Sequence, residues 1–330
     1  MRLSEKKIKE LAVANFGEGI REISVLEKKG GMFNSAYEVS FYLGNTSELE
    51  EFVLKVAVAP ETELLTYEKD IMRAEVKVYL MLQGMDIPTP EIIKYDFSRT
   101  LLPCDYFFMT KLQGTSWNMF KKEISPENRK RLMEELGRYT AMIHSIHGNR
   151  FGYIKEEEGF LYPAWSEAFE SMVNHLIADG IDRKIKLPYG KILAAVEGRK
   201  NILDEIETAQ LVDFDLWAGN IFLLETEQGY EIEGIIDFER AFYGDPYADF
   251  VSSVLLYKDV EKETAFLEGY KRQSGRELTF TSNDRVRLKL YRIYLNMIMV
   301  IETYRYNKAY AALMKFYCRW QIRKDLNSLT

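Results

Sequence analysis

The chain has 330 residues, of which 47% are hydrophobic and 29% are charged. This length exceeds what one hydrophobic core usually supports, so two lobes are expected, and the composition is globular rather than disordered or membrane-embedded. The formal net charge of −7 argues against a nucleic-acid partner, because such a partner usually requires a basic face.

The first expected element is an amphipathic helix within residues 1–19, with Ile8, Leu11, Ala12 and Phe16 on one side. No apolar stretch here has the length of a signal peptide, and none elsewhere approaches a membrane span. A cytoplasmic protein without a membrane partner is therefore expected.

The first third of the chain then alternates in the manner of β-strands and predicts a five-stranded sheet with one inserted helix. A helical pattern covers residues 61–85 and ends near Gly84. The expected strands cover residues 24–30, 35–44, 50–59, 87–98 and 104–114. The short connections between the first three strands favour an antiparallel arrangement.

From about residue 115 the pattern becomes mostly helical, apart from short apolar strands around polar turns in residues 210–250. Helices are expected over residues 125–147, 165–180 and 186–203, and one or two buried helices over 285–320. The prediction is an α+β chain with two lobes. A small antiparallel-sheet lobe with one helix covers residues 1–110, and a larger, mostly helical lobe covers residues 111–330.

The strongest chemical signal is a set of three polar residues at strand edges. Asp215 and Asn220 are five residues apart on one turn, and Asp237 follows an apolar strand seventeen residues later. Phosphoryl transfer needs a carboxylate that orients the attacking hydroxyl and two oxygen ligands that hold magnesium against the phosphates. The same residues could also serve only as turn formers of a β-hairpin.

Upstream, Lys55 is a lone cation on an apolar strand, which is costly unless a phosphate or a carboxylate meets it. Glu75 on the expected helix could pair with Lys55 and hold it toward the α- and β-phosphates, with Glu68 as the alternative. A solvated lysine on an edge strand is the remaining interpretation. These residues predict a nucleotide site in the first lobe.

Two backbone segments complete the expected nucleotide site. The turn that contains Gly31, Asn34 and Ser35 can fold over phosphates with its N–H groups pointing inward, although a plain hairpin turn fits equally well. The strand that leaves the first lobe would meet the purine edge with the backbone of Thr110 to Leu112.

These stretches resemble the aminoglycoside phosphotransferase family, which is related to choline kinase and the protein kinases. The resemblance runs over most of the chain, from "GGMFNSAYEV" through "FVLKVA" to "DFDLWAGNIF" and "IIDFERAFYGDPYADF". It implies a bilobal protein-kinase-like fold and a small-molecule kinase that uses ATP or GTP with Mg²⁺. The implied roles are the catalytic carboxylate for Asp215, magnesium ligands for Asn220 and Asp237, and phosphate positioning for Lys55 with Glu75.

The sequence departs from the family pattern at two positions near Asp215. Asp213 stands where family members usually carry a histidine, and Trp217 stands where a second histidine is common. A second carboxylate could raise the pKa of Asp215 or could bond only to the loop backbone. The departure at Asp213 keeps open a second function, a nucleotide-binding or regulatory module without turnover.

The acceptor is expected to be a small molecule with a hydroxyl group. Thirteen acidic residues and a single base, Arg240, lie between Leu203 and Asp249, and this field would attract a cationic acceptor. Several of these acids could equally be solvated residues on the surface of a hairpin. An amino-sugar antibiotic is the leading candidate through the resemblance, and an amino alcohol, a sugar or a macrolide stays open. A monomer or a weak dimer is expected.

Overall fold

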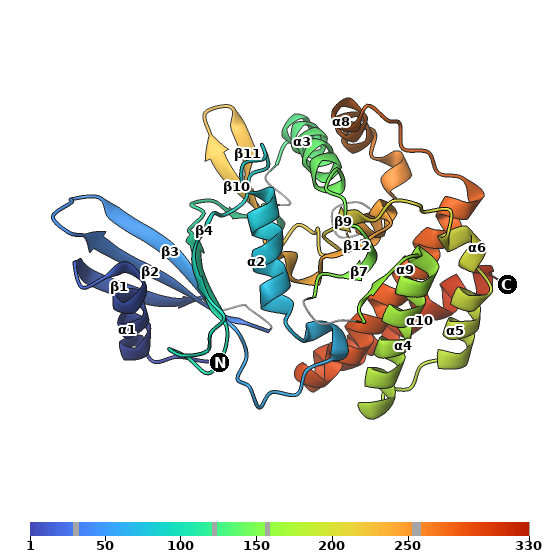
Figure 1. Ribbon diagram of the computed structural model, residues 1–330. Coiled ribbons are helices and arrows are strands. Elements are labelled where there is room, and N and C mark those ends of the chain that lie inside the picture. The colour runs from blue at the N-terminus through green and yellow to red at the C-terminus, as the bar shows by residue number, and fades with distance from the viewer. Residues whose placement is uncertain (29–32, 121–123, 156–158, 253–258, 330) are drawn as a thin grey trace.

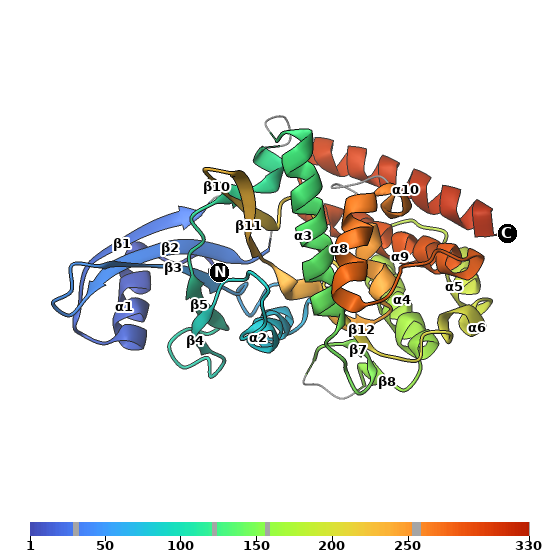
Figure 2. The same cartoon turned by 90° about the horizontal axis from the view of Figure 1, so that it is seen from above.

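The computed structural model describes residues 1–28, 33–120, 124–155, 159–252 and 259–329. A sheet-rich part and a larger helical part lie side by side, with α2 and the β10–β11 hairpin between them (Figures 1 and 2). This arrangement confirms the expected α+β class. No helix in these ranges is both long and apolar enough to cross a lipid bilayer.

The sheet-rich part contains the predicted five-stranded antiparallel sheet, in the order β1-β2-β3-β5-β4. Its strands are β1 (Ile20–Lys28), β2 (Ser35–Leu43), β3 (Leu49–Val56), β4 (Ile92–Asp96) and β5 (Tyr106–Thr110). Helix α1 (Glu5–Phe16) covers one face of this sheet, and Phe16 packs against Phe41 and Phe52. Ser4 caps the helix by accepting a hydrogen bond from the N–H of Lys7 at 3.3 Å.

The inserted helix is shorter than predicted. Helix α2 covers only Ile71–Leu82, whereas residues 61–70 contain the 3₁₀ turn η1 (Thr66–Glu68). Tertiary contacts override the helical periodicity here, because Leu65 and Tyr67 are buried in the core of the helical part. The backbone N–H of Thr66 also donates to Asp179 Oδ2 at 2.8 Å, which ties this connection to α4.

The helical part is built from eight helices within the described ranges and two small sheets. The sheets are β11-β10-β6 and β8-β7-β12-β9. The helices are α3 (Pro126–His144), α4 (Trp165–Asp182), α5 (Tyr189–Glu197), α6 (Lys200–Leu203), α7 (Asp249–Ser252), α8 (Thr264–Ser274), α9 (Ser282–Ile301) and α10 (Lys308–Leu329). The strands are β6 (Thr115–Ser116), β7 (Phe151–Tyr153), β8 (Leu161–Tyr162), β9 (Gln210–Val212), β10 (Ile221–Thr226), β11 (Gly229–Ile235) and β12 (Phe242–Gly244).

The two parts share a hydrophobic cluster. Val78 of α2 and Phe107 of β5 belong to the same buried group as Leu136 of α3 and Ile221 of β10. The position of α2 is therefore set by both parts at once, which matters because α2 carries Glu75.

The last two helices differ from the prediction of buried helices. Helix α9 is buried along most of its length, but α10 is buried on one face only. Phe316 is the clearest exception, with 73% of its surface exposed. Hydrophobic residues at helical spacing are therefore no sign of complete burial in α10.

Candidate active site

The site lies where β3, α2 and the end of β11 meet, and Lys55 is its central cation. The ammonium Nζ is 2.7 Å from Glu75 Oε2 and 2.6 Å from Asp237 Oδ1. It is also 3.6 Å from Glu239 Oε2. Because strand neighbours point to opposite faces, the fully buried Leu54 and Val56 face α1 while Lys55 faces α2.

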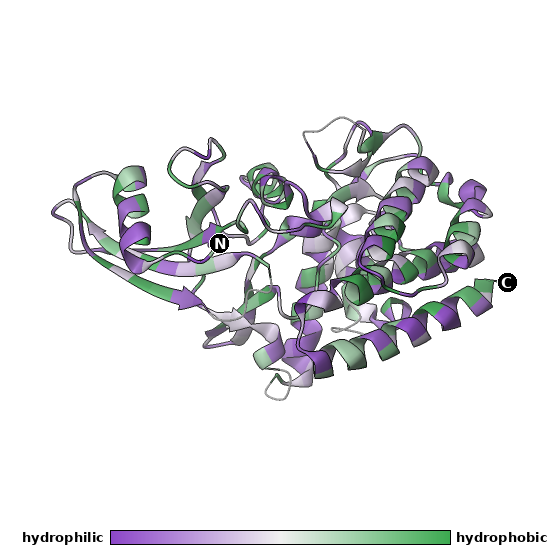
Figure 3. Ribbon diagram, turned by 90° about the horizontal axis from the view of Figure 1, so that it is seen from below, coloured by the Kyte–Doolittle hydropathy of each residue, from purple (hydrophilic) through white to green (hydrophobic). Residues whose placement is uncertain are grey.

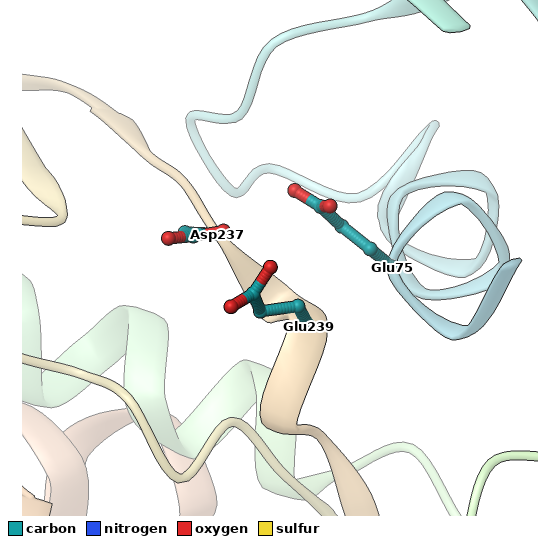
Figure 4. Close-up of side chains that lie close together, drawn as sticks. All are labelled: Glu75, Asp237 and Glu239. Atoms are coloured by element: carbon teal, nitrogen blue, oxygen red, sulfur yellow. The ribbon is translucent and has the colours of Figure 1, made fainter. Parts of the chain in front are cut away.

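The three carboxylates around Lys55 lie together in Figure 4 and come from two elements. Oxygens of Glu75, Asp237 and Glu239 lie within 4.8 Å of one another. Burial alone would lower the pKa of Lys55, but Asp237, Glu75 and Glu239 outweigh it and raise this pKa well above its usual value. Burial raises the pKa of Glu75 to about 7 against the opposing effect of Lys55.

The alternative partner of Lys55 is engaged elsewhere. Glu68 forms a bidentate ion pair with Arg305, which lies between α9 and α10. The guanidinium of Arg305 also stands 5.0 Å from the ring centroid of Phe33. Glu68 is therefore a link between the parts of the molecule, and Glu75 is the residue that meets Lys55.

The hairpin of β10 and β11 brings Asn220 and Asp237 to one end. Ile221 pairs with Ile235, and the N–H of Ile236 donates to the Asn220 carbonyl at 2.9 Å. Asp237 has a left-handed backbone with φ of 71°, which is uncommon for a residue other than glycine. Its N–H donates to the Tyr79 hydroxyl at 3.1 Å, so α2 stabilises this conformation.

Asp215 lies on the loop between β9 and β10, and this loop is held at two points. The amide of Asn220 donates to the Asp215 carbonyl at 3.0 Å and to its Oδ2 at 3.2 Å. The carboxylate of Asp249 accepts from the backbone N–H groups of Asp213 and Phe214 at 3.2 and 2.5 Å. Phe214 has a φ of 59°, so the loop is strained next to the candidate base.

Asp249 is in turn fixed by the helices. It accepts from His144 Nε2 at 2.9 Å, while His144 Nδ1 is 3.0 Å from the Tyr270 hydroxyl. His144 is at the end of α3, which crosses α8 so closely that a Cβ at Gly269 would stand 1.9 Å from a backbone oxygen. The histidine therefore has a structural role, because it holds the Asp249 carboxylate in place.

Arg240 is the residue of this site that the sequence analysis did not assign. Its Nη1 is 3.8 Å from Asp215 Oδ1, and its Nη2 is 3.0 Å from Glu302 Oε1. Glu302 also accepts hydrogen bonds from the hydroxyls of Tyr67 and Tyr306. Burial raises the pKa of Asp215 to about 7, and Arg240 opposes this rise. The only sequence signal was a lone base three residues after Asp237.

Asp213 fills the position where the family pattern has histidine. It is fully buried, and neither carboxyl oxygen has a hydrogen-bond partner among the described residues. Burial, followed by the charges of Asp249 and Asp215, raises the pKa of Asp213 well above its usual value. The backbone of Asp215 works against this rise in the pKa of Asp213, although neither carboxyl oxygen of Asp213 is in normal hydrogen-bonding geometry with it. The surroundings of Asp213 therefore disfavour the charged form of its carboxyl group.

The expected phosphate loop is only partly described, because Gly31 lies outside the described residues. Asn34 is buried and donates from Nδ2 to Glu239 Oε2 at 3.1 Å, while its Oδ1 has no partner among the residues described. Ser35 begins β2 and pairs with Val56. The end of the loop therefore contacts Glu239, one of the three carboxylates around Lys55.

The expected purine contact lies at the end of β5. The N–H of Thr110 already donates to the Glu91 carbonyl at 3.0 Å. The backbone N–H and C=O of Leu112 form no hydrogen bond with any other described residue. Glu233 holds the next turn by accepting from the N–H groups of Gln113 and Gly114 at 2.7 and 2.6 Å. Leu112 thus offers free backbone groups on a fixed segment.

The acidic field is weaker than the sequence suggested, because several of its members have structural partners. Asp249 holds the loop that carries Asp215, as described above. The other pairs are Asp204 with Ser166, Glu205 and Asp245 with Arg287, and Glu233 with the backbone of Gln113 and Gly114. The acids that remain at the site itself are Asp215, Asp237 and Glu239.

Asn220 and Asp237 are suited to a magnesium ion. Mg²⁺ prefers oxygen ligands, and an amide and a carboxylate at one end of a hairpin supply them. The group of Glu75, Asp237 and Glu239 by itself surrounds Lys55 and is primarily an ammonium site. Asp237 belongs to both arrangements, so it is the residue that would link the metal to Lys55.

The fold and the site define a class of kinase-like phosphotransferases, and the sequence agrees. Residues 32–291 match the model of the phosphotransferase enzyme family, so the chain belongs to this family. The members of this family are described as phosphotransferase enzymes. No curated protein matches the sequence.

The solved structures that resemble this chain share its fold at low sequence identity. A Ralstonia eutropha JMP134 protein, provisionally assigned as an aminoglycoside phosphotransferase, is 12% identical with a TM-score of 0.68, covering 99% of this chain and 98% of its own. The aminoglycoside phosphotransferase APH(4)-Ia is 16% identical with a TM-score of 0.62, covering 97% and 99%. ADP-bound APH(2'')-Ib is 16% identical with a TM-score of 0.59, covering 98% and 99%.

Proposed function

We propose that this protein transfers the γ-phosphate of ATP or GTP to a hydroxyl group of a small molecule in the cytoplasm. The observation that carries this proposal is the position of Lys55, which joins Glu75 to Asp237 in one site with Asp215. A regulatory module without turnover would not need Asp215 held by both Asn220 and Arg240. Residues 1–110 form the nucleotide-binding lobe in this proposal, and residues 111–330 carry the catalytic and acceptor groups.

The nucleotide would lie between the two lobes. Lys55, oriented by Glu75, contacts the α- and β-phosphates, and the loop with Gly31, Asn34 and Ser35 covers them. The segment from Thr110 to Leu112 meets the purine, with the free backbone groups of Leu112 making the hydrogen bonds. This geometry accepts ATP and GTP, since both purines present a donor and an acceptor edge.

Magnesium would be held by Asn220 and Asp237 and would neutralise phosphate charge during transfer. The protein's own contribution is to place these two oxygen ligands at one end of the β10–β11 hairpin. The left-handed backbone at Asp237, supported by Tyr79, turns its side chain toward Lys55.

Asp215 is the proposed general base. Its carboxylate accepts a hydrogen bond from the acceptor hydroxyl and takes the proton as the new O–P bond forms and the bond to the leaving nucleotide diphosphate breaks. A base works best when its pKa lies near the working pH, and the pKa of Asp215 is about 7. Arg240 favours the ionised form of Asp215, and Glu302 in turn holds Arg240.

An amino sugar is the first acceptor to test. Structures of related fold hold such molecules, namely hygromycin B in APH(4)-Ia and streptomycin in APH(2'')-IIa. Asp215, Asp237 and Glu239 keep the site acidic, which favours a cationic acceptor. An amino alcohol, a sugar and a macrolide are the other members of the test panel.

The experiment is a phosphotransfer assay over this panel with ATP and with GTP, for the wild type and for Asp215→Asn. Nucleotide binding is measured in parallel by titration calorimetry. Turnover that depends on Asp215 supports the kinase, and the best acceptor names its substrate class. Binding of nucleotide with no turnover on any acceptor would instead support the regulatory module.

A further inference from the structure

The outer face of α10 carries a hydrophobic stripe that no other described segment covers. The stripe consists of Tyr310, Leu313, Phe316, Tyr317 and Trp320, which are all exposed. The opposite face of the helix, with Cys318, Ile322 and Leu326, is buried against the protein. Helix α10 runs along the edge of the molecule, and hydrophobic residues recur along it up to the C-terminal end (Figures 2 and 3).

The size of the stripe separates it from ordinary surface residues. Single exposed apolar side chains are common, but contiguous exposed patches usually mark contact sites. Phe316, Leu313 and Trp320 are 73%, 64% and 50% exposed on successive turns of one helix. The steps from Tyr310 to Leu313, Tyr317 and Trp320 are three, four and three residues, which is the spacing of a helix–helix seam.

We propose that the stripe binds the same stripe of a second copy of this chain, with the two α10 helices antiparallel around a two-fold axis. A spacing of three, four and three residues reads the same in both directions. An antiparallel pair therefore sets Tyr310 opposite the partner's Trp320 and Leu313 opposite the partner's Tyr317. A two-fold contact of this kind is the commonest way in which identical chains associate.

The area of the stripe fits a dimer. A fully exposed side chain of this size presents roughly 200 Å², so the exposed fractions give about 550 Å² per copy. Two copies would bury roughly 1,100 Å² before the rim is counted, close to the lower limit of about 1,200 Å² for specific interfaces. The expected complex is therefore a dimer whose population depends on protein concentration.

The direction of the pair follows from the helix dipoles. Basic residues lie at both ends of the stripe, Lys308 before Tyr310 and Arg323 with Lys324 after Trp320, so the side-chain charges favour neither direction. Opposed helix dipoles favour the antiparallel direction.

The test compares two leucine substitutions of similar exposure. Leu313→Glu places a charge in the stripe, and Leu26→Glu is the matched control, because Leu26 is 61% exposed and lies on β1 rather than on α10. Sedimentation equilibrium of the full chain should show a two-chain mass for the wild type and for Leu26→Glu. Leu313→Glu should weaken the dimer at least tenfold and shift the mass to one chain. Thermal unfolding should show that both variants are folded.

Three results would overturn the proposal. The first is a single-chain mass of the wild type up to its solubility limit. The second is a dimer that survives both Leu313→Glu and Trp320→Glu. The third is a monomeric wild type that binds vesicles of anionic lipid and loses this binding in Leu313→Glu, which would assign the stripe to a membrane surface. None of these measurements depends on the proposed kinase activity.

Discussion

The guanidinium of Arg240 lies 3.8 Å from the carboxylate of Asp215 and joins the candidate base to the end of α9. Its other terminal nitrogen is 3.0 Å from Glu302, and Glu302 also accepts from Tyr67 of the η1 connection. One charged network therefore links the catalytic loop, the connection after β3 and the end of α9. The network makes the ionisation of Asp215 dependent on residues far from it in the sequence.

The first prediction concerns the pH dependence of turnover. Asp215 must be ionised to act as a base, and its pKa is about 7, so kcat should rise with pH through this value and level off above it. Arg240→Gln removes the charge that opposes the burial effect, so the pKa of Asp215 should rise. The rising limb should move about one unit to higher pH, since a close opposite charge commonly shifts a carboxyl group by that much or more.

The measurement is kcat against pH for the wild type, Arg240→Gln and the control Arg285→Gln, whose ion pair with Glu261 is at the surface. Arg240→Gln leaves the buried Glu302 without its ion partner. The double variant Arg240→Gln/Glu302→Gln removes both charges and so tests the same pKa shift without an unpaired buried carboxylate. If the rising part of the kcat–pH curve stays at the wild-type pH in both Arg240 variants, Arg240 does not lower the pKa of Asp215.

The second prediction separates turnover from binding at Asp215. Asp215→Asn keeps the size of the side chain but removes the basic oxygen, so kcat should fall by roughly 10²–10⁴. Nucleotide Kd should change little, because Lys55 and the metal ligands hold the phosphates. Asp213→Asn should have a milder effect on kcat. If Asp213→Asn proves the more damaging of the two, the catalytic role belongs to position 213.

The third prediction concerns metal-dependent nucleotide binding. Asp237→Ala removes a proposed magnesium ligand and one contact of Lys55, so the gain in nucleotide affinity that Mg²⁺ produces should fall at least about tenfold. Chelation of Mg²⁺ should bring the wild type to a similar affinity. Asp86→Ala is the control, because Asp86 is an exposed acid paired with Arg138 away from the site. Titration calorimetry with and without Mg²⁺ measures this change in nucleotide affinity. If Asp237→Ala leaves both the affinity and the turnover unchanged, Asp237 has no part in the mechanism.

The fourth prediction concerns the stability of the fold. The pKa of Asp213 is raised in the folded chain, so the wild type loses stability as the pH rises above the ordinary carboxyl value of about 4 toward the folded value. Asp213→Asn carries no such group. The variant should gain about 1–3 kcal/mol in free energy of unfolding relative to the wild type at pH 8, and this gain should vanish near pH 4. Urea unfolding at the two pH values measures the difference, and equal curves at both would show that Asp213 is not a strained carboxyl group.

The five-stranded sheet and the cation proposed to contact the phosphates, Lys55, could be predicted from the sequence because the signals for both are local. Period-two alternation in residues 35–44 and 50–59 predicts strands; β2 lies within the first range, and β3 begins one residue before the second. The same alternation leaves Lys55 alone on one strand face, where a partner is required. The structure then shows that this partner is Glu75, while Glu68 pairs with Arg305.

The length of α2 and the exposure of α10 could not be predicted from the sequence. Both segments have hydrophobic residues at helical spacing, and periodicity does not say what those residues contact. In residues 61–70 the side chains of Leu65 and Tyr67 insert into the core of the helical part, so the helix begins only at Ile71. In α10 the second apolar face meets no other described part of the chain.

The sequence by itself determined the α+β fold, the order of the chemical groups and the family, because strand alternation, helix periodicity and short polar motifs are properties of neighbouring residues. Only the tertiary structure decided which charges meet. Lys55 is 182 residues from Asp237 in the chain, and Arg240 is 25 residues from Asp215. Burial makes these interactions strong by removing water from between the charges. The packing of α9 brings Glu302 to Arg240, sixty-two residues away, and no local pattern encodes that contact.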